Sequence, residues 1–252
     1  MLNEAALRRA LHAAGLDAPV RWDDVTDSTH RTAMGLATAG APAWTLVGAG
    51  HQTAGRGRAG RTWVDRPGAA VMLSLVLRPT LAADRLGVVS LAAGITMADA
   101  VGEAGGPEVR CKWPNDLLVD GAKVGGILAT SGVDREASPY VVLGIGVNLE
   151  PPDGVAGAAG IGHVDEEVLV AAFVARLASL LDEEPDAIVD AWRVRSDTLG
   201  RRVEATTVEG VDVRGVAADV DATGALLVDG DADAGRVRVA FGDVTHLRAD
   251  AG

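Results

Sequence analysis

The chain contains few of the residues that several classes of site and compartment depend on. It has a single cysteine, Cys111, which cannot close an intramolecular disulfide or build a structural zinc site and which favours a reducing compartment. The mainly apolar run from Ala69 to Leu77 is about half as long as a membrane-spanning helix. The first residues, Met1 to Arg9, lack the apolar segment of a secretory signal. We therefore expect a cytoplasmic protein without a membrane span.

Positive charge is also scarce, but it is unevenly placed. Thirty-five acidic and 23 basic residues give a net charge of −12, which would repel a phosphate backbone and argues against DNA as a partner. Residues 28–64 nevertheless contain no Asp or Glu, although Arg31, Arg56, Arg58 and Arg61 lie in that window. A purely cationic stretch in an acidic protein indicates an anionic ligand, the alternative being a chance gap on a solvated face.

Lysine and the side-chain amides are rare enough for each to be notable. Only Lys112 and Lys123 represent lysine, Gln52 is the only glutamine, and Asn115 and Asn148 are two of the three asparagines. Where arginine would serve solubility, a retained lysine suggests a need for a compact ammonium. The two lysines lie close together in the sequence, which favours a functional interpretation over survival by drift.

Hydrophobic periodicity predicts alternating helices and strands over the first 198 residues. The expected helices are 3–14, 30–39, 86–103, 165–181 and 186–192, and the expected strands are 20–25, 44–48, 69–77, 109–113, 117–119, 122–128 and 140–149. The Asp-Gly pair at 120–121 predicts a hairpin in which Leu118 faces Lys123 and Asp116 faces Gly125. Asp116 and Lys123 would then lie on one face of the ribbon as diagonal neighbours.

The pattern changes near residue 200. From Arg202 onward, short alternating segments at 203–208, 211–220, 225–228 and 237–241 are separated by glycine-containing turns, with no helical period. Such a pattern predicts a small all-β barrel. We therefore expect an α+β protein, with a mixed sheet and helices in residues 1–198 and a separate β domain in residues 199–252.

The segment Gly55 to Gly60 (GRGRAG) formally matches the dinucleotide-binding fingerprint. That fingerprint must open a helix and meet an acidic residue about 20 positions later. Here a second strand follows, and no acidic residue lies between Arg66 and Thr80. A nicotinamide oxidoreductase is thus disfavoured, whereas a glycine loop with three arginines suits a phosphate or carboxylate ligand.

Four strings in this order resemble the biotin protein ligases, also called biotin-[acetyl-CoA-carboxylase] ligases. The strings are GRGRAGRTW at 55–63, KWPND at 112–116, KVGGIL at 123–128 and GIGVNL at 144–149, with Asp-Ser-Thr upstream at 27–29. The resemblance covers nearly the whole chain and implies a class II synthetase-like catalytic domain with an SH3-like carboxy-terminal barrel. Lipoate ligases share the catalytic fold but lack the arginine-glycine string. About 20 residues precede the first strand, so the chain resembles the monofunctional group, which lacks a DNA-binding domain.

The resemblance implies an ATP-dependent reaction that forms biotinyl-5′-AMP with Mg²⁺ and transfers biotin to a lysine of a carboxylase carrier domain. The residues it implies for catalysis are Lys123, Arg58, Asp116 and Lys112. Those implied for biotin are Ser28, Thr29, Gln52, Gly55, Arg56, Arg58, Lys123 and Gly126. Those implied for the nucleotide are Arg58, Lys112, Asn115 and Asn148. Asp116 is either the proton acceptor or a Mg²⁺ ligand, and a salt bridge to Lys123 is its structural alternative.

Several of these residues have plainer interpretations. Helix capping alone would explain Ser28 or Thr29, and Trp63 and Trp113 are either core residues or the floor of a pocket. The segment 53–65 is expected to fold over the intermediate and exclude water. A noncatalytic biotin-sensing module remains an alternative, against which the presence of Lys112, Asp116 and Lys123 argues.

Overall fold

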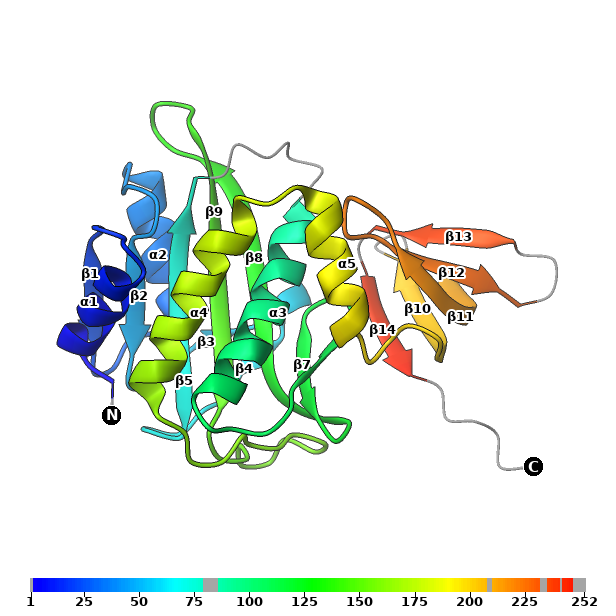
Figure 1. Ribbon diagram of the computed structural model, residues 1–252, viewed down its shortest axis with the longest axis horizontal. Helices are drawn as coiled ribbons and strands as arrows, with labels where there is room; N and C mark the ends of the chain where they lie inside the picture. The colour runs from blue at the N-terminus through cyan, green and yellow to red at the C-terminus, as the bar shows by residue number, and fades with distance from the viewer. Residues whose placement is uncertain (1, 79–85, 208–209, 232–234, 241, 247–252) are drawn as a thin grey trace.

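The structure is a computed structural model that describes residues 2–78, 86–207, 210–231, 235–240 and 242–246. A large sheet with helices on both faces forms the first part of the chain, and a smaller sheet lies beside it at the carboxy-terminal end (Figure 1). This arrangement confirms the expected α+β class. Among the described residues, none of the helices has the length and apolar character needed to cross a membrane.

The large sheet has seven strands. Their order is β1 (Val20–Asp23), β2 (Leu46–Ala49), β5 (Ala70–Leu77), β9 (Pro139–Asn148), β8 (Ala122–Val133), β7 (Asp116–Val119) and β6 (Arg110–Lys112). Strands β1 and β2 are parallel and every other neighbouring pair is antiparallel, so the sheet is mixed as expected. The central strands β5 and β9 are almost wholly buried because helices cover both of their faces.

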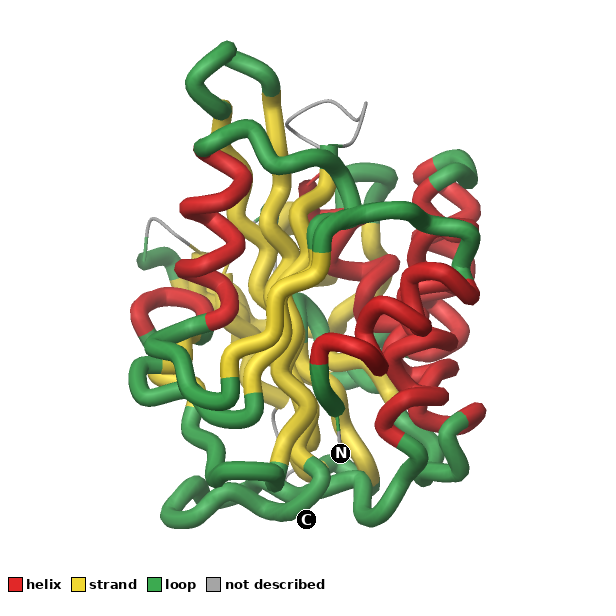
Figure 2. Tube along the Cα trace, turned by 90° about the vertical axis from the view of Figure 1, so that its left-hand side faces the viewer, coloured by secondary structure: helices red, strands yellow, loops and turns green. Residues whose placement is uncertain are grey.

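The helices are divided unequally between the two faces (Figure 2). Helices α1 (Glu4–Ala13), α3 (Leu86–Glu103) and α4 (Glu166–Leu181) bury their apolar sides with one face of the sheet in the main core, and α5 (Pro185–Arg195) packs against α3. Helix α2 (Thr29–Thr38) packs on the other face, where a smaller apolar cluster includes Ala33, Val76 and Val142. The face beside α2 is therefore left with room for a site.

Helix capping distinguishes two of the helices from α2. Asn3 accepts a hydrogen bond from the Ala6 amide at the start of α1, and Asp165 accepts from two amides at the start of α4. Ser28 occupies the same position before α2, yet its side chain makes no capping hydrogen bond. Capping therefore does not explain Ser28.

The hairpin of β7 and β8 departs from the predicted register at one point. Leu118 lies opposite Lys123 as predicted, but Asp116 lies opposite Gly126 and not Gly125. The cause is a β-bulge, since Val124 is an extra residue on β8. The prediction that Asp116 and Lys123 share one face is confirmed, because their side chains form an ion pair.

The carboxy-terminal part forms a five-stranded antiparallel sheet. Its strands, in spatial order, are β13 (Arg236–Val239), β12 (Leu226–Gly230), β11 (Asp212–Val220), β10 (Arg202–Thr207) and β14 (Gly242–His246). Four of the strands match the predicted segments approximately. Strand β14, which pairs with β10, was not predicted because its five residues contain a single large apolar side chain, Val244.

The two parts of the chain are joined through Trp113, which is 2% exposed. Its backbone amide donates to Thr198 Oγ1 at 2.9 Å, and its indole Nε1 donates to the Gly224 carbonyl at 3.0 Å. The β domain thus holds the residue that precedes Pro114 in the KWPND string. Trp113 is a core residue at the junction, although one side of it lines a cavity next to the main one.

Candidate active site

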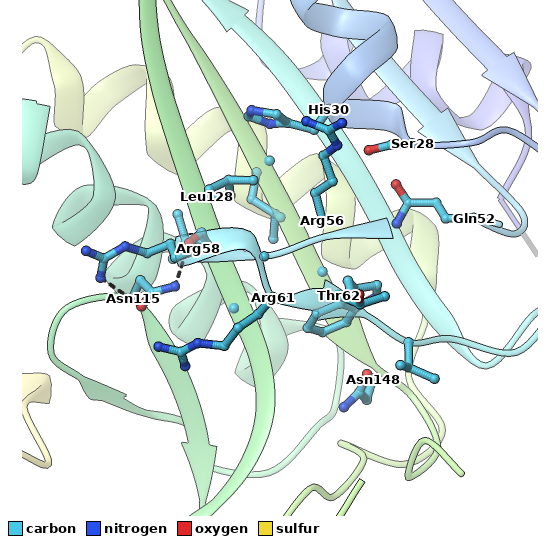
Figure 3. Close-up of a pocket in the computed structure, with 18 of the residues that line it drawn as sticks. Ser28, His30, Gln52, Arg56, Arg58, Arg61, Thr62, Asn115, Leu128 and Asn148 are labelled. Carbon is cyan, nitrogen blue, oxygen red and sulfur yellow. Dashed lines mark hydrogen bonds between the residues drawn. The ribbon is translucent and has the colours of Figure 1, made fainter. Parts of the chain in front are cut away.

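The main cavity lies between the open face of the large sheet and a short hairpin. The hairpin consists of β3 (Gly55–Arg56), the 3₁₀ turn η1 (Arg58–Gly60) and β4 (Thr62–Trp63). The cavity volume is about 240 Å³, and its walls come from the start of α2, the hairpin, strands β5, β8 and β9, and the loop after β9 (Figure 3). The segment that the sequence placed over the site is therefore an ordered ribbon along one wall.

Most of the residues predicted for the site line this cavity. They are Ser28, Thr29, Gln52, Arg56, Arg58, Asn115, Asp116, Lys123, Gly126 and Asn148. Gly55 and Lys112 do not. Gly55 has a structural role, because a Cβ there would lie 2.6 Å from the Trp63 carbonyl oxygen. Lys112 lies opposite Asp116 in the backbone register of β6 and β7 and near His246 of the β domain, whose pKa is lowered mainly by burial and to a smaller extent by the charge of Lys112.

At one end of the cavity, called the closed end below, the wall consists of the buried polar side chains of Ser28, Thr29 and Gln52. The side chains of Ser28 and Thr29 project from the start of α2, and Gln52 follows β2. Thr29 donates to Gln52 Oε1 from its backbone amide at 2.8 Å. Ser28 Oγ is fully buried and has no hydrogen-bond partner. Because a buried hydroxyl without a partner is costly, this end is built for a polar ligand group.

Two arginines of the hairpin extend across the sheet. Arg58 Nη1 donates to Asn115 Oδ1 at 3.3 Å, and Asn115 Nδ2 donates to the Ile127 carbonyl at 2.7 Å (Figure 3). The hairpin is thereby connected to the KWPND string. Arg56 extends toward the imidazole of His30, on the other side of the cavity (Figure 3). Three arginines of the cationic window, Arg56, Arg58 and Arg61, therefore line one cavity, whereas Arg31 lies outside its lining and forms an exposed ion pair with Asp27.

Lys123 lines the cavity and is held in place through contacts of both its side chain and its backbone. Its Nζ lies 2.5 Å from Asp116 Oδ1. Its backbone amide donates to the Gly157 carbonyl at 3.0 Å, and its carbonyl accepts from the Ala159 amide at 2.8 Å. The loop after β9 therefore fixes the position of Lys123, and an anion in the cavity would meet an ammonium already oriented by a carboxylate.

Two glycines of β9 make room for side chains that cross the sheet. A Cβ at Gly146 would lie 2.6 Å from the indole of Trp63, and one at Gly144 would lie 2.8 Å from His30 Nδ1. Trp63 lines the cavity, and its Nε1 is buried without a partner. Of the two interpretations that the sequence allowed for Trp63, a core residue or part of a pocket, the structure supports the second, because the indole forms part of the cavity wall.

We predict that Gly146→Ala displaces Trp63 and the hairpin. An added methyl group in a filled space costs about 1–3 kcal/mol, so ligand affinity should fall by roughly one order of magnitude while the sheet stays folded. Titration calorimetry with the ligand and the emission of Trp63 would measure the effect. Gly35→Ala is the matched control: nothing lies within 4 Å of that helical glycine, and its substitution should leave affinity unchanged. Unaltered affinity in Gly146→Ala would contradict the assignment.

His30, in the first turn of α2, is a cavity residue that the sequence did not single out. It is 8% exposed, its Nε2 lies 3.0 Å from Thr130 Oγ1, and its Nδ1 has no partner. Burial, and to a smaller extent the charge of Arg56, lower the pKa of His30 to about 4. The ring is therefore neutral at physiological pH and adds no charge to the cavity.

We predict that the fold loses stability through His30 between pH 6.5 and pH 4. In this interval the unfolded chain binds a proton that the folded chain does not, because the folded pKa is lowered from 6.5 to about 4. The contribution is fully present above pH 6.5 and falls by up to roughly 3 kcal/mol toward pH 4. Urea unfolding at a series of pH values measures it. His30→Asn should flatten the slope, and an unchanged slope would contradict the prediction.

A divalent metal would have few protein ligands here. Within the described parts of the chain, no three His, Cys, Asp or Glu side chains are grouped so that they could hold a metal. Asp116 is the single carboxylate among the cavity-lining residues, and one of its oxygens already accepts from Lys123. This donor set fits Mg²⁺ held mainly by phosphates and water, with one carboxylate contributed by the protein.

Some cavity residues could not have been found from spacing alone. Ser74 lies within the apolar strand β5, whereas Thr62 and Arg61, which also line the cavity, belong to the GRGRAGRTW string. A polar residue inside an apolar run is the one signal that Ser74 offers. Cys111 lies outside the cavity lining, and burial raises the pKa of its thiol to about 12, as for an unreactive buried thiol.

Comparison with known proteins supports a family assignment. Residues 22–148 match the Biotin/lipoate A/B protein ligase family, and residues 198–247 match the Biotin protein ligase C terminal domain. The chain is 37% identical to the biotin-[acetyl-CoA-carboxylase] ligase of Mycobacterium tuberculosis, over 98% of this chain and 96% of that protein. It is also 37% identical to the bifunctional ligase/repressor BirA of Bacillus subtilis, over 59% of this chain and 46% of that protein.

Solved structures with a similar fold include a member of the same family. The biotin protein ligase of Aquifex aeolicus, solved in complex with biotin and ATP, superposes with a TM-score of 0.74 at 22% identity, over 92% of this chain and 99% of that one. The sequence matches cover both the catalytic part and the β domain. The chain belongs to the biotin protein ligase family.

Proposed function

We propose that this protein activates biotin with ATP and transfers it to a lysine of a carrier domain of an acyl-CoA carboxylase. The observation that carries the proposal is the convergence of Arg58 and Lys123 on one cavity whose closed end has buried, partly unpartnered polar groups. A ligand with a carboxylate at one end and a polar ring at the other suits this cavity. Biotin has both, because its valeryl carboxylate and its urea ring lie at opposite ends.

In the first half-reaction a biotin carboxylate oxygen attacks the α-phosphorus of ATP. The new oxygen–phosphorus bond replaces the bond to the β-phosphate oxygen, and pyrophosphate leaves. Two anions approach each other in this step, so fixed positive charge lowers its barrier. Lys123 and Arg58, which both line the cavity, supply that charge. Lys123 binds the biotin carboxylate, and Arg58 binds the phosphate of the adenylate.

The nucleotide lies beyond the reacting atoms, along the side of the cavity formed by Asn115, Asn148 and the loop after β9. Asn148 is 4% exposed, and its Nδ2 donates to the Ala159 carbonyl at 3.1 Å. Its position is thus fixed before a ligand binds. Lys112 lies outside the lining of the cavity, opposite Asp116 in the pair of β6 and β7, and adds positive charge there. Mg²⁺ would be held mainly by the ATP phosphates, with Asp116 as its protein ligand in this first step only, and it would supply further neutralisation of the phosphate charge.

In the second half-reaction the ε-amine of the acceptor lysine attacks the carbonyl carbon of the mixed anhydride. The carbon–nitrogen bond forms, the carbon–oxygen bond to phosphate breaks, and AMP leaves with the bonding electrons. The amine must lose a proton, and Asp116 is the carboxylate that lines the cavity. Once the ammonium of Lys123 has turned from Asp116 to the ligand, the Asp116 carboxylate is free to accept the proton of the acceptor amine.

Exchange of labelled pyrophosphate into ATP tests the proposal directly. Exchange should depend on biotin, because the reverse of the first half-reaction requires biotinyl-5′-AMP on the protein. Lipoate in place of biotin should support little or none. Biotin-dependent exchange without transfer to a carrier domain would limit the protein to activation, and absence of exchange with saturating biotin would refute the proposed activity. A cytoplasmic location stays a prediction.

A further inference from the structure

A chain of hydroxyl groups lies behind the closed end of the cavity. Ser74 interrupts the apolar strand β5, is fully buried, and lines the cavity wall. Its Oγ donates to Thr29 Oγ1 at 3.0 Å, and Thr29 Oγ1 donates in turn to Gln52 Oε1 at 3.2 Å. Three side chains from β5, α2 and the segment after β2 are thus connected in one direction, from Ser74 to Gln52.

The backbone of Thr29 fixes which end of the Gln52 amide is oxygen. The Thr29 amide lies 2.8 Å from the atom assigned as Oε1, and a backbone N–H can only donate, so that atom has to be an acceptor. The NH₂ group of Gln52 is therefore at the other position. There it meets Met72 Sδ at 3.2 Å, a weak acceptor. Figure 3 shows the amide of Gln52 directed toward the cavity, with Ser28 beside it.

We propose that Ser74 is a positioning residue which, through Thr29, holds Gln52 with its NH₂ group facing the ligand, so that the closed end selects a carbonyl oxygen. The inference rests on the proposed function, because the urea ring of biotin carries such an oxygen. Thr29 donates its hydroxyl proton to Gln52 Oε1, so it affects the ligand by holding the Gln52 amide in place. Ser28, whose hydroxyl has no partner, remains to meet a ring N–H.

This arrangement distinguishes a cyclic urea from a cyclic guanidine of the same shape. A urea presents an oxygen acceptor to the Gln52 NH₂ group, whereas the guanidine of 2-iminobiotin presents N–H donors at that point. Two donors facing each other in a buried site leave both groups unsatisfied. Sites that hydrogen-bond a ligand group reject analogues without it far more strongly than apolar pockets reject a missing methylene.

The first test is Gln52→Glu with biotin and 2-iminobiotin as ligands. The carboxylate can still accept both bonds from Thr29, but it replaces the NH₂ donor with an oxygen. The measurements are made at about pH 9 to favour the ionised carboxylate, because burial at this position raises the pKa of the new carboxyl while the two accepted hydrogen bonds lower it. The ratio of the two dissociation constants, from calorimetry, should shift by at least about 100-fold in favour of 2-iminobiotin. A ratio within threefold of wild type, roughly the context dependence of a single hydrogen bond, would overturn the inference.

The second test addresses Ser74 itself. Ser74→Ala should weaken biotin binding by roughly 3- to 10-fold, the range of one neutral hydrogen bond, and leave ATP binding unchanged. Because Ser74 acts through Gln52, the same substitution in a Gln52→Ala background should have no further effect on biotin. Equal losses in both backgrounds would make Ser74 merely structural. Thr96→Ala, which removes a buried hydroxyl from α3, is the control and should leave both ligands unaffected.

The outcomes separate this inference from the proposed function. If the wild-type protein neither binds biotin nor supports biotin-dependent pyrophosphate exchange, the proposed function fails. If it does both, and Gln52→Glu leaves the preference for biotin over 2-iminobiotin unchanged, only the orientation of Gln52 and the role of Ser74 are refuted.

Discussion

Lys123→Ala should lower the rate of biotin-dependent pyrophosphate exchange by roughly 10³-fold, the size of effect seen when one preorganised charge-stabilising group is removed. The physical reason is that the ammonium lies inside the cavity at the point where two anions must meet, with its backbone fixed by the loop after β9. Folding should be little affected, because the ion pair with Asp116 is partly exposed and such pairs contribute about 1 kcal/mol or less.

The comparison variant for this prediction is Arg8→Ala. Arg8 also forms an ion pair, with Glu4 on the exposed side of α1, but it lies outside the cavity. Its loss should leave exchange at the wild-type rate. Thermal unfolding of both variants shows whether either change acts through stability. Near-normal exchange in a folded Lys123→Ala variant would remove Lys123 from the chemistry.

Arg58→Gly should release the activated intermediate roughly 10- to 100-fold faster, which is the cost of losing a hydrogen bond to a charged group. Arg58 connects the hairpin to Asn115 and lines both the main cavity and the one beside Trp113. Without it, the adenylate phosphate loses a partner and the hairpin loses a tie to the KWPND string. Biotinyl-5′-AMP that leaves the protein should then react with amines of unrelated proteins.

Two measurements check the release of the intermediate. Dissociation of preformed adenylate can be followed by rapid dilution, and labelling of serum albumin present in the same solution reports escape. Arg214→Ala is the control, since Arg214 pairs with Glu204 on the exposed surface of the β domain, outside the cavity. An Arg58→Gly variant with wild-type dissociation and no labelling of albumin would show that Arg58 does not retain the intermediate.

The regular elements of the fold could be predicted from the sequence because their signals are local. The helix at 86–103 has the predicted bounds, and the Asp-Gly hairpin lies where the turn residues place it. The bulge at Val124 could not be predicted, since it depends on how β8 pairs with two neighbours at once. Strands β3 and β4, of two residues each, are too short to show a period, and β14 has a single large apolar side chain.

In the candidate site, too, some residues could be predicted from the sequence and others could not. Ten of the predicted residues line one cavity, and nine of these belong to the motif strings, Gln52 being the exception. The strings did not single out His30 or Ser74, whose positions in the site depend on tertiary contacts. His30 enters the site because Gly144 on β9 leaves space for its ring, and Ser74 because α2 and the segment after β2 pack on β5. Lys112 shows the converse, since a motif residue lies outside the cavity lining.

The β domain contacts the segment that carries two of the cavity residues. Trp113 donates one hydrogen bond to Thr198 Oγ1 and another to the carbonyl of Gly224 in a turn of the β domain. The same turn touches α3, where a Cβ at Gly87 would lie 2.5 Å from the Thr223 carbonyl oxygen. The β domain is thus in direct contact with the segment that leads into Asn115 and Asp116, and it helps to set the position of these residues.

A crystal structure with a non-hydrolysable analogue of biotinyl-5′-AMP is the most direct test of the central claim, that one cavity brings both reacting anions between two cations. The account predicts oxygens of the acyl-phosphate linkage within hydrogen-bonding distance of Arg58 and Lys123, the urea ring against Ser28 and Gln52, and the nucleoside near Asn148. A ligand bound elsewhere on the protein, or in this cavity with its phosphate remote from Arg58 and Lys123, would contradict it.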